Sequence, residues 1–142
     1  MNNFFSKAEE DIIIRAIQEA EKRCESEIRV HVDFADPKIQ VLDAAVKAFN
    51  RMGMYKTIHR NGVLIFLLPE RNEFAIIGDT AINEQVDKGF WEKVNQLMNS
   101  YFEDSRFVLG TCEAIQLIGN ELNKYFPAIS EKNELPDEIS YS

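Results

Sequence analysis

The spacing of apolar residues along the chain predicts a helix followed by a strand. Over residues 7–24, apolar side chains recur at steps of three, four and seven, which places them on one helical stripe. Ser6 and Glu9 stand at the spacing of a capping box, so we expect Ser6 to be the N-cap of this helix. Residues 27–34 then alternate between apolar and polar positions, which is the pattern of a strand with one better-buried face.

A second helix and a hairpin should follow. Asp36 and Pro37 suit the N-cap and first position of a helix that Gly53 would end. Residues 63–68 are apolar at every position, which is typical of a strand covered on both faces and predicts a central place in the sheet. A turn then leads into a third strand over 73–77, so these two strands should form a hairpin.

Two long helices should complete the fold. The first begins near Asn83 as its N-cap and carries an apolar stripe to Tyr101, and the second covers about 107–125. In the order α-β-α-β-β-α-α, the right-handed crossover between the first two strands makes them parallel. Helices on both faces of a small mixed sheet give an α/β fold, a three-layer α/β/α sandwich. We place this single domain at residues 1–127, with a polar C-terminal arm over 128–142.

The arm should not be wholly free of the domain. Leu135 and Ile139 are apolar residues four positions apart within an otherwise polar stretch. We therefore expect partial order around these two residues, with the arm docked onto the domain.

Composition and charge narrow the classes of partner. The chain has 142 residues, and 16 basic against 24 acidic residues give a net charge of −8. Nucleic-acid binding and attraction to anionic lipid are not expected, because both need clustered Lys and Arg. The two cysteines are too few for a disulfide framework or a four-ligand zinc site. No signal peptide or membrane anchor is expected, so we predict a cytoplasmic monomer with an unknown protein partner as its possible ligand.

Several segments together resemble one protein family. These are SEIRVHVD, MGMYKTIHRNGVLIFLL and ERNEFAIIGDTAINEQV, followed by FW, FVLG, KYFP and the ending NELPDEIS. In this order, and over nearly the whole chain, they resemble the TPM domain family, in particular its short bacterial members. RNGVLIFL followed by FAIIGD is the most specific part of the match.

The resemblance implies an α/β/α domain, and it implies that some members bind calcium or other divalent ions. It also implies a possible acid-phosphatase activity, since this has been reported for a thylakoid-lumen member of the family in plants. Many members carry a signal peptide and a membrane anchor, and this chain shows the pattern of neither.

The sequence contains none of the usual catalytic motifs, and carboxylates are its main candidates for chemistry. Strand order brings Glu27, Asn61 and Asp79 to one edge of the predicted sheet, with Glu25 nearby. It brings a second set to the opposite edge, namely Asp33, Asp36 and Glu70. Hard oxygen donors of this kind suit calcium or magnesium, so we predict a metal at the first edge and keep Asp33 and Asp36 as the second choice.

Simpler interpretations of the same residues stay open. Asp36 could serve only as an N-cap, and Asp79 could serve only to bond the amides of a turn. The hypotheses are thus a divalent-cation-binding TPM-like domain that acts as an accessory or protein-interaction module, a weak metal-dependent phosphatase, and a partner-binding module without a ligand. For the phosphatase, only Lys56 and Arg60 offer positive groups that could hold phosphate.

Overall fold

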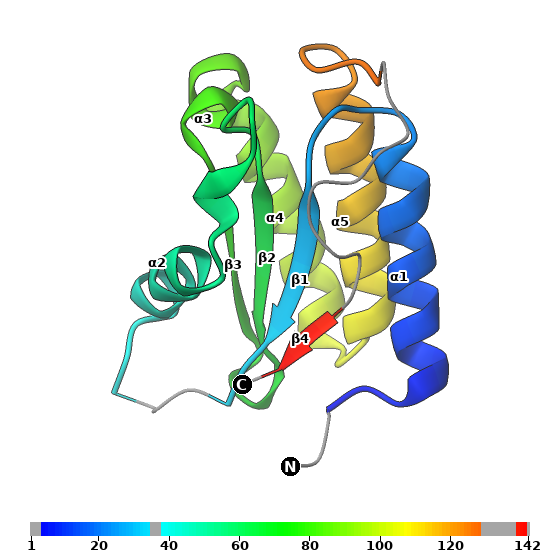
Figure 1. The fold of residues 1–142 in the computed structure, drawn as a ribbon. Coiled ribbons are helices and arrows are strands. Elements are labelled where there is room, and N and C mark those ends of the chain that lie inside the picture. Colours follow the sequence, from blue (N-terminus) through cyan, green and yellow to red (C-terminus); the bar gives the residue numbers. More distant parts are fainter. Residues whose placement is uncertain (1–3, 35–37, 129–138, 142) are drawn as a thin grey trace.

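The computed structural model of the protein describes residues 4–34, 38–128 and 139–141. Its strands form one sheet, and its helices cover that sheet (Figure 1). In chain order they are α1 (Lys7–Glu21), β1 (Ile28–Val32), α2 (Val41–Arg51), β2 (Val63–Leu68), β3 (Glu73–Gly78), α3 (Thr80–Gln85), α4 (Lys88–Glu103), α5 (Phe107–Leu122) and β4 (Ile139–Tyr141). Short 3-10 turns, Met54–Lys56 and Pro69–Arg71, flank β2.

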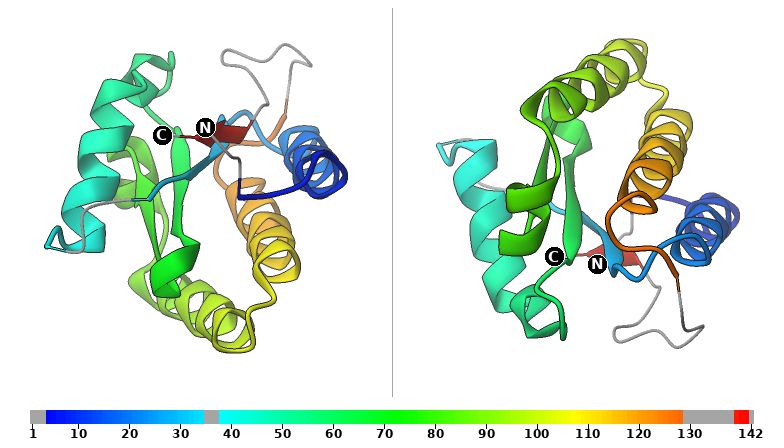
Figure 2. Two further views of the ribbon diagram at one scale, coloured as in Figure 1. Left: turned by 90° about the horizontal axis from the view of Figure 1, so that it is seen from below. Right: turned by 90° about the horizontal axis from the view of Figure 1, so that it is seen from above.

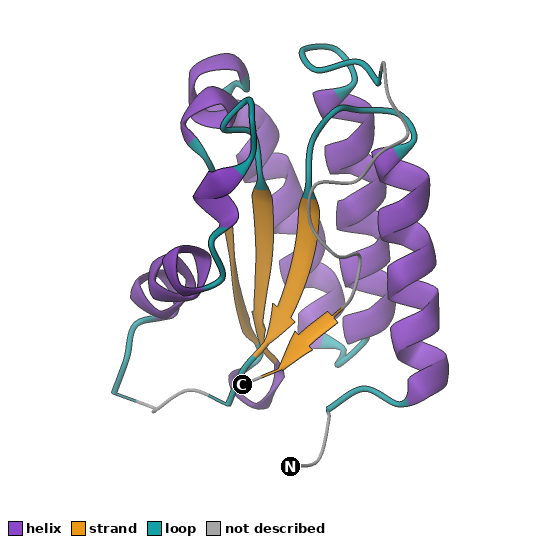
Figure 3. Ribbon diagram, in the orientation of Figure 1, coloured by secondary structure: helices purple, strands orange, loops and turns teal. Residues whose placement is uncertain are grey.

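The sheet is mixed and has the strand order β3-β2-β1-β4. The predicted parallel pairing of the first two strands is confirmed, with Ile28 opposite Val63. The predicted hairpin is also confirmed, since β2 and β3 pair antiparallel from Val63–Gly78 to Leu68–Glu73. Helix α2 covers one face of the sheet, while α1, α4 and α5 cover the other (Figures 2 and 3). The three-layer α/β/α sandwich predicted from the sequence is therefore correct.

Each face of the sheet has its own hydrophobic core. Alternate residues of β2 point to opposite faces, so Ile65 joins the larger core with α1, α4 and α5, whereas Phe66 joins the smaller core under α2. All six residues of β2 are buried, as their uninterrupted apolar sequence predicted. β2 is hydrogen-bonded on both edges, to β1 and to β3, which confirms its central place.

The helices α1 and α5 approach each other closely. The contact is possible because Gly119 has no side chain: a Cβ atom built there would lie 2.8 Å from the Cβ of Ala20 and 3.1 Å from its Cα. Two small residues thus set the distance between the helices and allow α1 to cover the larger core.

Local capping divides one of the predicted helices into two. The long helix predicted from Asn83 is two helices, α3 and α4, because Asp79 caps the first and Asp87 caps the second. The carboxylate of Asp87 accepts a hydrogen bond from the backbone N–H of Gly89 (3.2 Å). The prediction of Asn83 as the N-cap is therefore wrong, because two aspartates outcompete it.

Other boundaries differ more modestly. α2 begins at Val41 after Gln40, later than the Asp36-Pro37 start that we predicted, and Asp36 itself lies outside the described residues. Cys24 was predicted within the first helix but follows α1, in an isolated bridge to Pro127. β4 was not predicted as a strand.

No described helix is long and apolar enough to cross a membrane.

Replacement of Phe66 by alanine should lower the free energy of unfolding by about 3–5 kcal/mol, because a strand held on both faces cannot collapse around the cavity. Phe66 is fully buried. Urea unfolding measures the change, and Leu42→Ala on the 56% exposed surface of α2 is the control, with an expected effect within about 0.5 kcal/mol. A loss below about 1 kcal/mol for Phe66→Ala would contradict its central place.

Gly119→Ala should destabilise the protein by about 1–3 kcal/mol, because the added methyl group forces α1 and α5 apart. The same change in a chain that also carries Ala20→Gly should cost less, since the nearest opposing atom is then absent. A double-mutant cycle by thermal unfolding measures the coupling, which should exceed about 0.5 kcal/mol. Simple additivity would show that this contact does not set the helix spacing.

Candidate functional site

The strand register brings together the three residues of the first predicted site. The backbone N–H of Val63 donates to the carbonyl of Glu27 (2.8 Å), and the N–H of Asp79 donates to the carbonyl of Gly62 (3.0 Å). The starts of β1 and β2 and the end of β3 therefore meet at one sheet edge, with Asn61 directly before Gly62. Glu27, Asn61 and Asp79 lie at this end of the sheet, where β1 and β2 begin and β3 ends. We call it the polar edge.

Buried polar side chains concentrate at the polar edge. Six of the nine buried polar or charged residues of the described chain belong to it: Glu21, Ser26, Glu27, Thr57, Asn61 and Asp79. Three of these six are carboxylates. Because a buried charge is costly without compensation, this end of the sheet calls for cationic or hydrogen-bonding partners.

Arg60 supplies one such partner to Asp79. Its Nε donates to Oδ2 of Asp79 (2.7 Å) and its Nη2 donates to Oδ1 (2.8 Å), a bidentate ion pair. Oδ1 also accepts the N–H of Thr80 (2.8 Å), so Asp79 is both the N-cap of α3 and an ion-pair partner. The hydrogen bond to Asp79 raises the pKa of the Arg60 guanidinium. The turn role that we kept open for Asp79 is thus present in the structure.

The loop before β2 is shaped to deliver this arginine. Arg60 adopts a left-handed backbone conformation, with φ of 53°, and its carbonyl accepts the N–H of Ala81 (3.0 Å). Its side chain remains 50% exposed, whereas that of Asp79 is 4% exposed. The ion pair therefore joins a surface cation to a buried carboxylate, and water can reach it from one side.

Asn61 is the most deeply buried member of the polar edge. Its Nδ2 donates to the carbonyl of Glu25 (2.6 Å), and its backbone N–H donates to the hydroxyl of Thr57 (3.2 Å). Its Oδ1 is buried and accepts no hydrogen bond from the described residues. A buried amide oxygen of this kind has unused capacity to bind a donor or a cation.

Glu21 is a member of the polar edge that the sequence analysis missed. Its Oε2 accepts the N–H of Ile28 (3.0 Å), which ties the end of α1 to the start of β1. The signal was available, because Glu21 continues the apolar stripe of Ile13 and Ile17 at steps of four. An acidic residue on an apolar helical stripe should have marked a buried carboxylate.

Cys24 lies within the field of the same carboxylates. Burial first, and then the charges of Glu21 and Glu27, raise the pKa of its thiol to about 11. Burial likewise raises the pKa of Cys112 to about 11. Both thiols stay protonated near neutral pH, which makes them poor nucleophiles.

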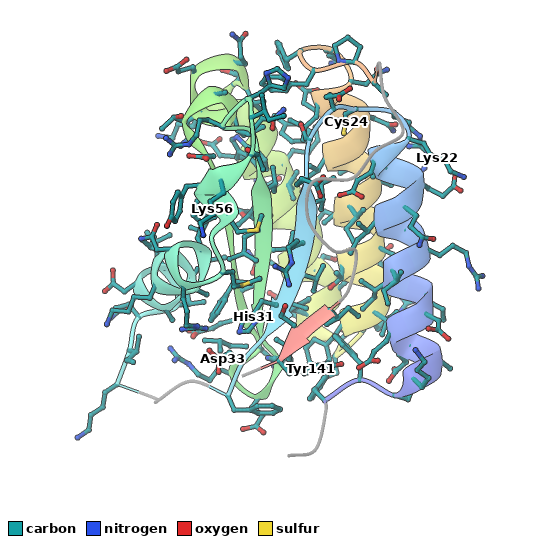
Figure 4. The ribbon with its side chains drawn as sticks, viewed as in Figure 1. Lys22, Cys24, His31, Asp33, Lys56 and Tyr141 are labelled. Atoms are coloured by element: carbon teal, nitrogen blue, oxygen red, sulfur yellow. The ribbon has the colours of Figure 1, made fainter. Side chains whose placement is uncertain are left out.

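The second predicted site lies at the opposite end of the sheet. Asp33 follows β1 there, with Oδ1 accepting the N–H of Phe34 (2.7 Å) and Oδ2 at 3.9 Å from Nε2 of His31 (Figure 4). Glu70 is exposed, and Asp36 is outside the described residues. Within the described ranges, no group of three His, Cys, Asp or Glu residues converges at either edge.

A comparison with known families identifies the chain. The family model of the TPM domain matches residues 1–121. The chain belongs to the TPM domain family. The resemblance inferred from the sequence segments is therefore correct. No match was found among functionally curated proteins.

Solved structures share the fold of this TPM domain. The NMR structure of the BA42 protein from the psychrophilic bacterium Bizionia argentinensis superposes with a TM-score of 0.92 at 36% identity, over 100% of this chain and 98% of that one. The N-terminal domain of cg2496 from Corynebacterium glutamicum has a TM-score of 0.67 at 14% identity, over 94% and 84%. A P. gingivalis N-terminal domain has a TM-score of 0.69 at 15% identity, over 87% and 80%. The last two similarities concern the fold alone.

Acidification should destabilise the domain through His31. Burial, together with the charges of Arg51 and Arg29, lowers its pKa from 6.5 to about 4, although Asp33 opposes the shift. Between these two values the unfolded chain binds more protons than the folded one, so stability falls as the pH decreases through this window. The contribution of His31 becomes independent of pH only well above 6.5, where the imidazole is neutral in both states.

Between pH 7 and pH 5 the His31 contribution should amount to about 2 kcal/mol of lost stability. Urea unfolding at both pH values measures it, and His31→Gln, which cannot titrate, should lose about 2 kcal/mol less than the wild type over the same interval. Equal losses in the two proteins would show that the imidazole is as easily protonated in the folded state as in the unfolded state.

Proposed function

We propose that this TPM domain binds a divalent cation at the polar edge through Glu27, Asn61 and Asp79, and acts as an accessory or interaction module rather than as an enzyme. The observation that carries the proposal is the buried Oδ1 of Asn61, which lacks a hydrogen bond from the described residues, at an edge that also buries carboxylates. The net charge of −8 and the cation binding implied by the family resemblance support it.

The donor set favours calcium or magnesium. Carboxylate and amide oxygens, supplemented by backbone carbonyls and water, form the usual shell of these ions. Zinc would prefer His or Cys, and the described residues contain no cluster of three such ligands, with or without carboxylates, that could hold it. Because the site has few charges, we expect a dissociation constant of about 10⁻⁴–10⁻³ M.

A cation at Asp79 must compete with Arg60. The guanidinium holds both oxygens of Asp79, so a cation can take this carboxylate only if Arg60 swings into water. The half-exposed arginine side chain has room to do so. Competition of this kind gives the proposal a signature that a metal bound elsewhere would lack.

Titration with calcium, followed residue by residue in NMR spectra, tests the proposal. Asp79→Asn should weaken binding by about tenfold or more, because it removes a charged ligand. Arg60→Gln should instead strengthen binding by about two- to fivefold, because it removes the competitor. Asp33→Asn is the matched control at the other edge and should bind as the wild type does.

Opposite outcomes lead to different conclusions. Loss of binding in Asp33→Asn but not in Asp79→Asn would move the site to the second edge. If the wild type does not respond to millimolar calcium or magnesium, cation binding is rejected, and a partner-binding module without a ligand becomes the better hypothesis.

The phosphatase alternative has a test of its own. It needs positive groups that can hold phosphate, but Arg60 already binds Asp79, and Nζ of Lys56 lies 6.0 Å from the ring centre of Tyr55. Turnover of a phosphate ester that survives purification and disappears in Asp79→Asn would favour the enzyme over the binding module.

A further inference from the structure

The outer edge of β3 carries backbone groups that point away from the sheet. The hydrogen bond from the N–H of Asp79 to the carbonyl of Gly62 fixes the alternation of the antiparallel ladder. Every second residue of β3, Ala75 among them, therefore bonds to β2. Phe74 and Ile76, which lie between them, direct their N–H and C=O groups outward.

These outward groups have no hydrogen-bond partner within the described part of the chain. Only the end of the strand is occupied, because Nδ2 of Asn83 donates to the carbonyl of Gly78 (3.0 Å). Natural edge strands are usually protected by Lys, Pro or a bulge. β3 has the sequence EFAIIG and a regular register, so it lacks these protections.

The edge lies at the floor of a groove between two helices. Residues of α2 form one wall and residues of α4 form the other, on opposite faces of the sheet (Figure 2). The α2 wall is apolar, with Val41 and the 56% exposed Leu42. The α4 wall is polar, with the amides of Asn95 and Asn99.

We propose that this groove binds an extended segment of a partner protein, which adds to β3 as a further strand. Four backbone groups of Phe74 and Ile76 supply the main-chain hydrogen bonds. Because side chains of an added strand alternate, every second one contacts Leu42 and Val41, and the others contact Asn95 and Asn99. The bound segment should therefore alternate between apolar and small polar residues.

Charge at the rim selects a basic segment. Two carboxylates, Glu92 and Glu103, are exposed on the same stripe of α4 as the two asparagines. These carboxylates favour Lys or Arg at the ends of the bound strand. They disfavour pairing with a second copy of this chain, because two such acidic rims would meet and each chain carries a net charge of −8.

A displayed library of random nine-residue peptides, selected on the full chain, provides the probe. We expect selected peptides to alternate apolar and polar residues and to carry net positive charge. Binding should slow the hydrogen exchange of the Phe74 and Ile76 amides at least about tenfold, and leave that of Ala75 almost unchanged because it is already bonded to β2. In an added strand, every second backbone N–H of the peptide bonds to β3 and the others point to solvent. N-methylation of the first set should abolish binding, and N-methylation of the second set should not.

Matched surface variants locate the binding. Leu42→Glu should lower the affinity for the selected peptide by about tenfold or more. Ile12→Glu, at a 49% exposed position on α1, should leave this affinity unchanged. Failure of the selection, equal effects of the two variants, or protection of amides outside β3 would overturn the proposal. So would a wild type that sediments as a dimer with Phe74 and Ile76 protected in the absence of peptide, since the occupant would then be a second copy.

Discussion

The fold depends on the burial of β2 on both faces. Side chains of six consecutive apolar residues point to both faces of the sheet, so one layer of helices cannot bury them all. Helices must therefore pack on both faces. α2 closes the smaller core, and the larger core needs α1, α4 and α5 together. The close contact of Gly119 with Ala20 is a consequence, because α1 covers its part of the larger core only when it packs tightly on α5.

The same constraint explains why polar chemistry collects at one end of the sheet. The apolar residues of β2 fill both faces of the sheet along this strand, so the buried carboxylates near β2 lie beyond its ends. At the polar edge, Asp79 combines two roles that would otherwise need two residues: it caps α3 and neutralises Arg60. The double role of Asp79 links the loop before β2 to the start of α3, because Arg60 in that loop bonds to the carboxylate that caps the helix.

Much of this arrangement was predictable from the sequence, and the exceptions have physical causes. The strands were predicted well because an unbroken apolar run and a clear alternation each fit one environment. The helix starts were less certain, because Asp36, Asn83 and Asp87 are all good caps and only tertiary context chooses between them. The site residues were brought to one edge by strand order alone. The pairing of Arg60 with Asp79 was not predictable, since it depends on a left-handed backbone conformation at a residue other than glycine.

The short strand β4 makes β1 an interior strand through a pairing that is distant in sequence. Arg29 and Ser140, which donate and accept one hydrogen bond (2.6 Å), are 111 positions apart along the chain. The pairing of β4 with β1 consists of three residue pairs, Val30–Ile139, His31–Ser140 and Val32–Tyr141. Without this short ladder β1 would be an edge strand, whereas β2 is paired on both sides, with β1 and with β3.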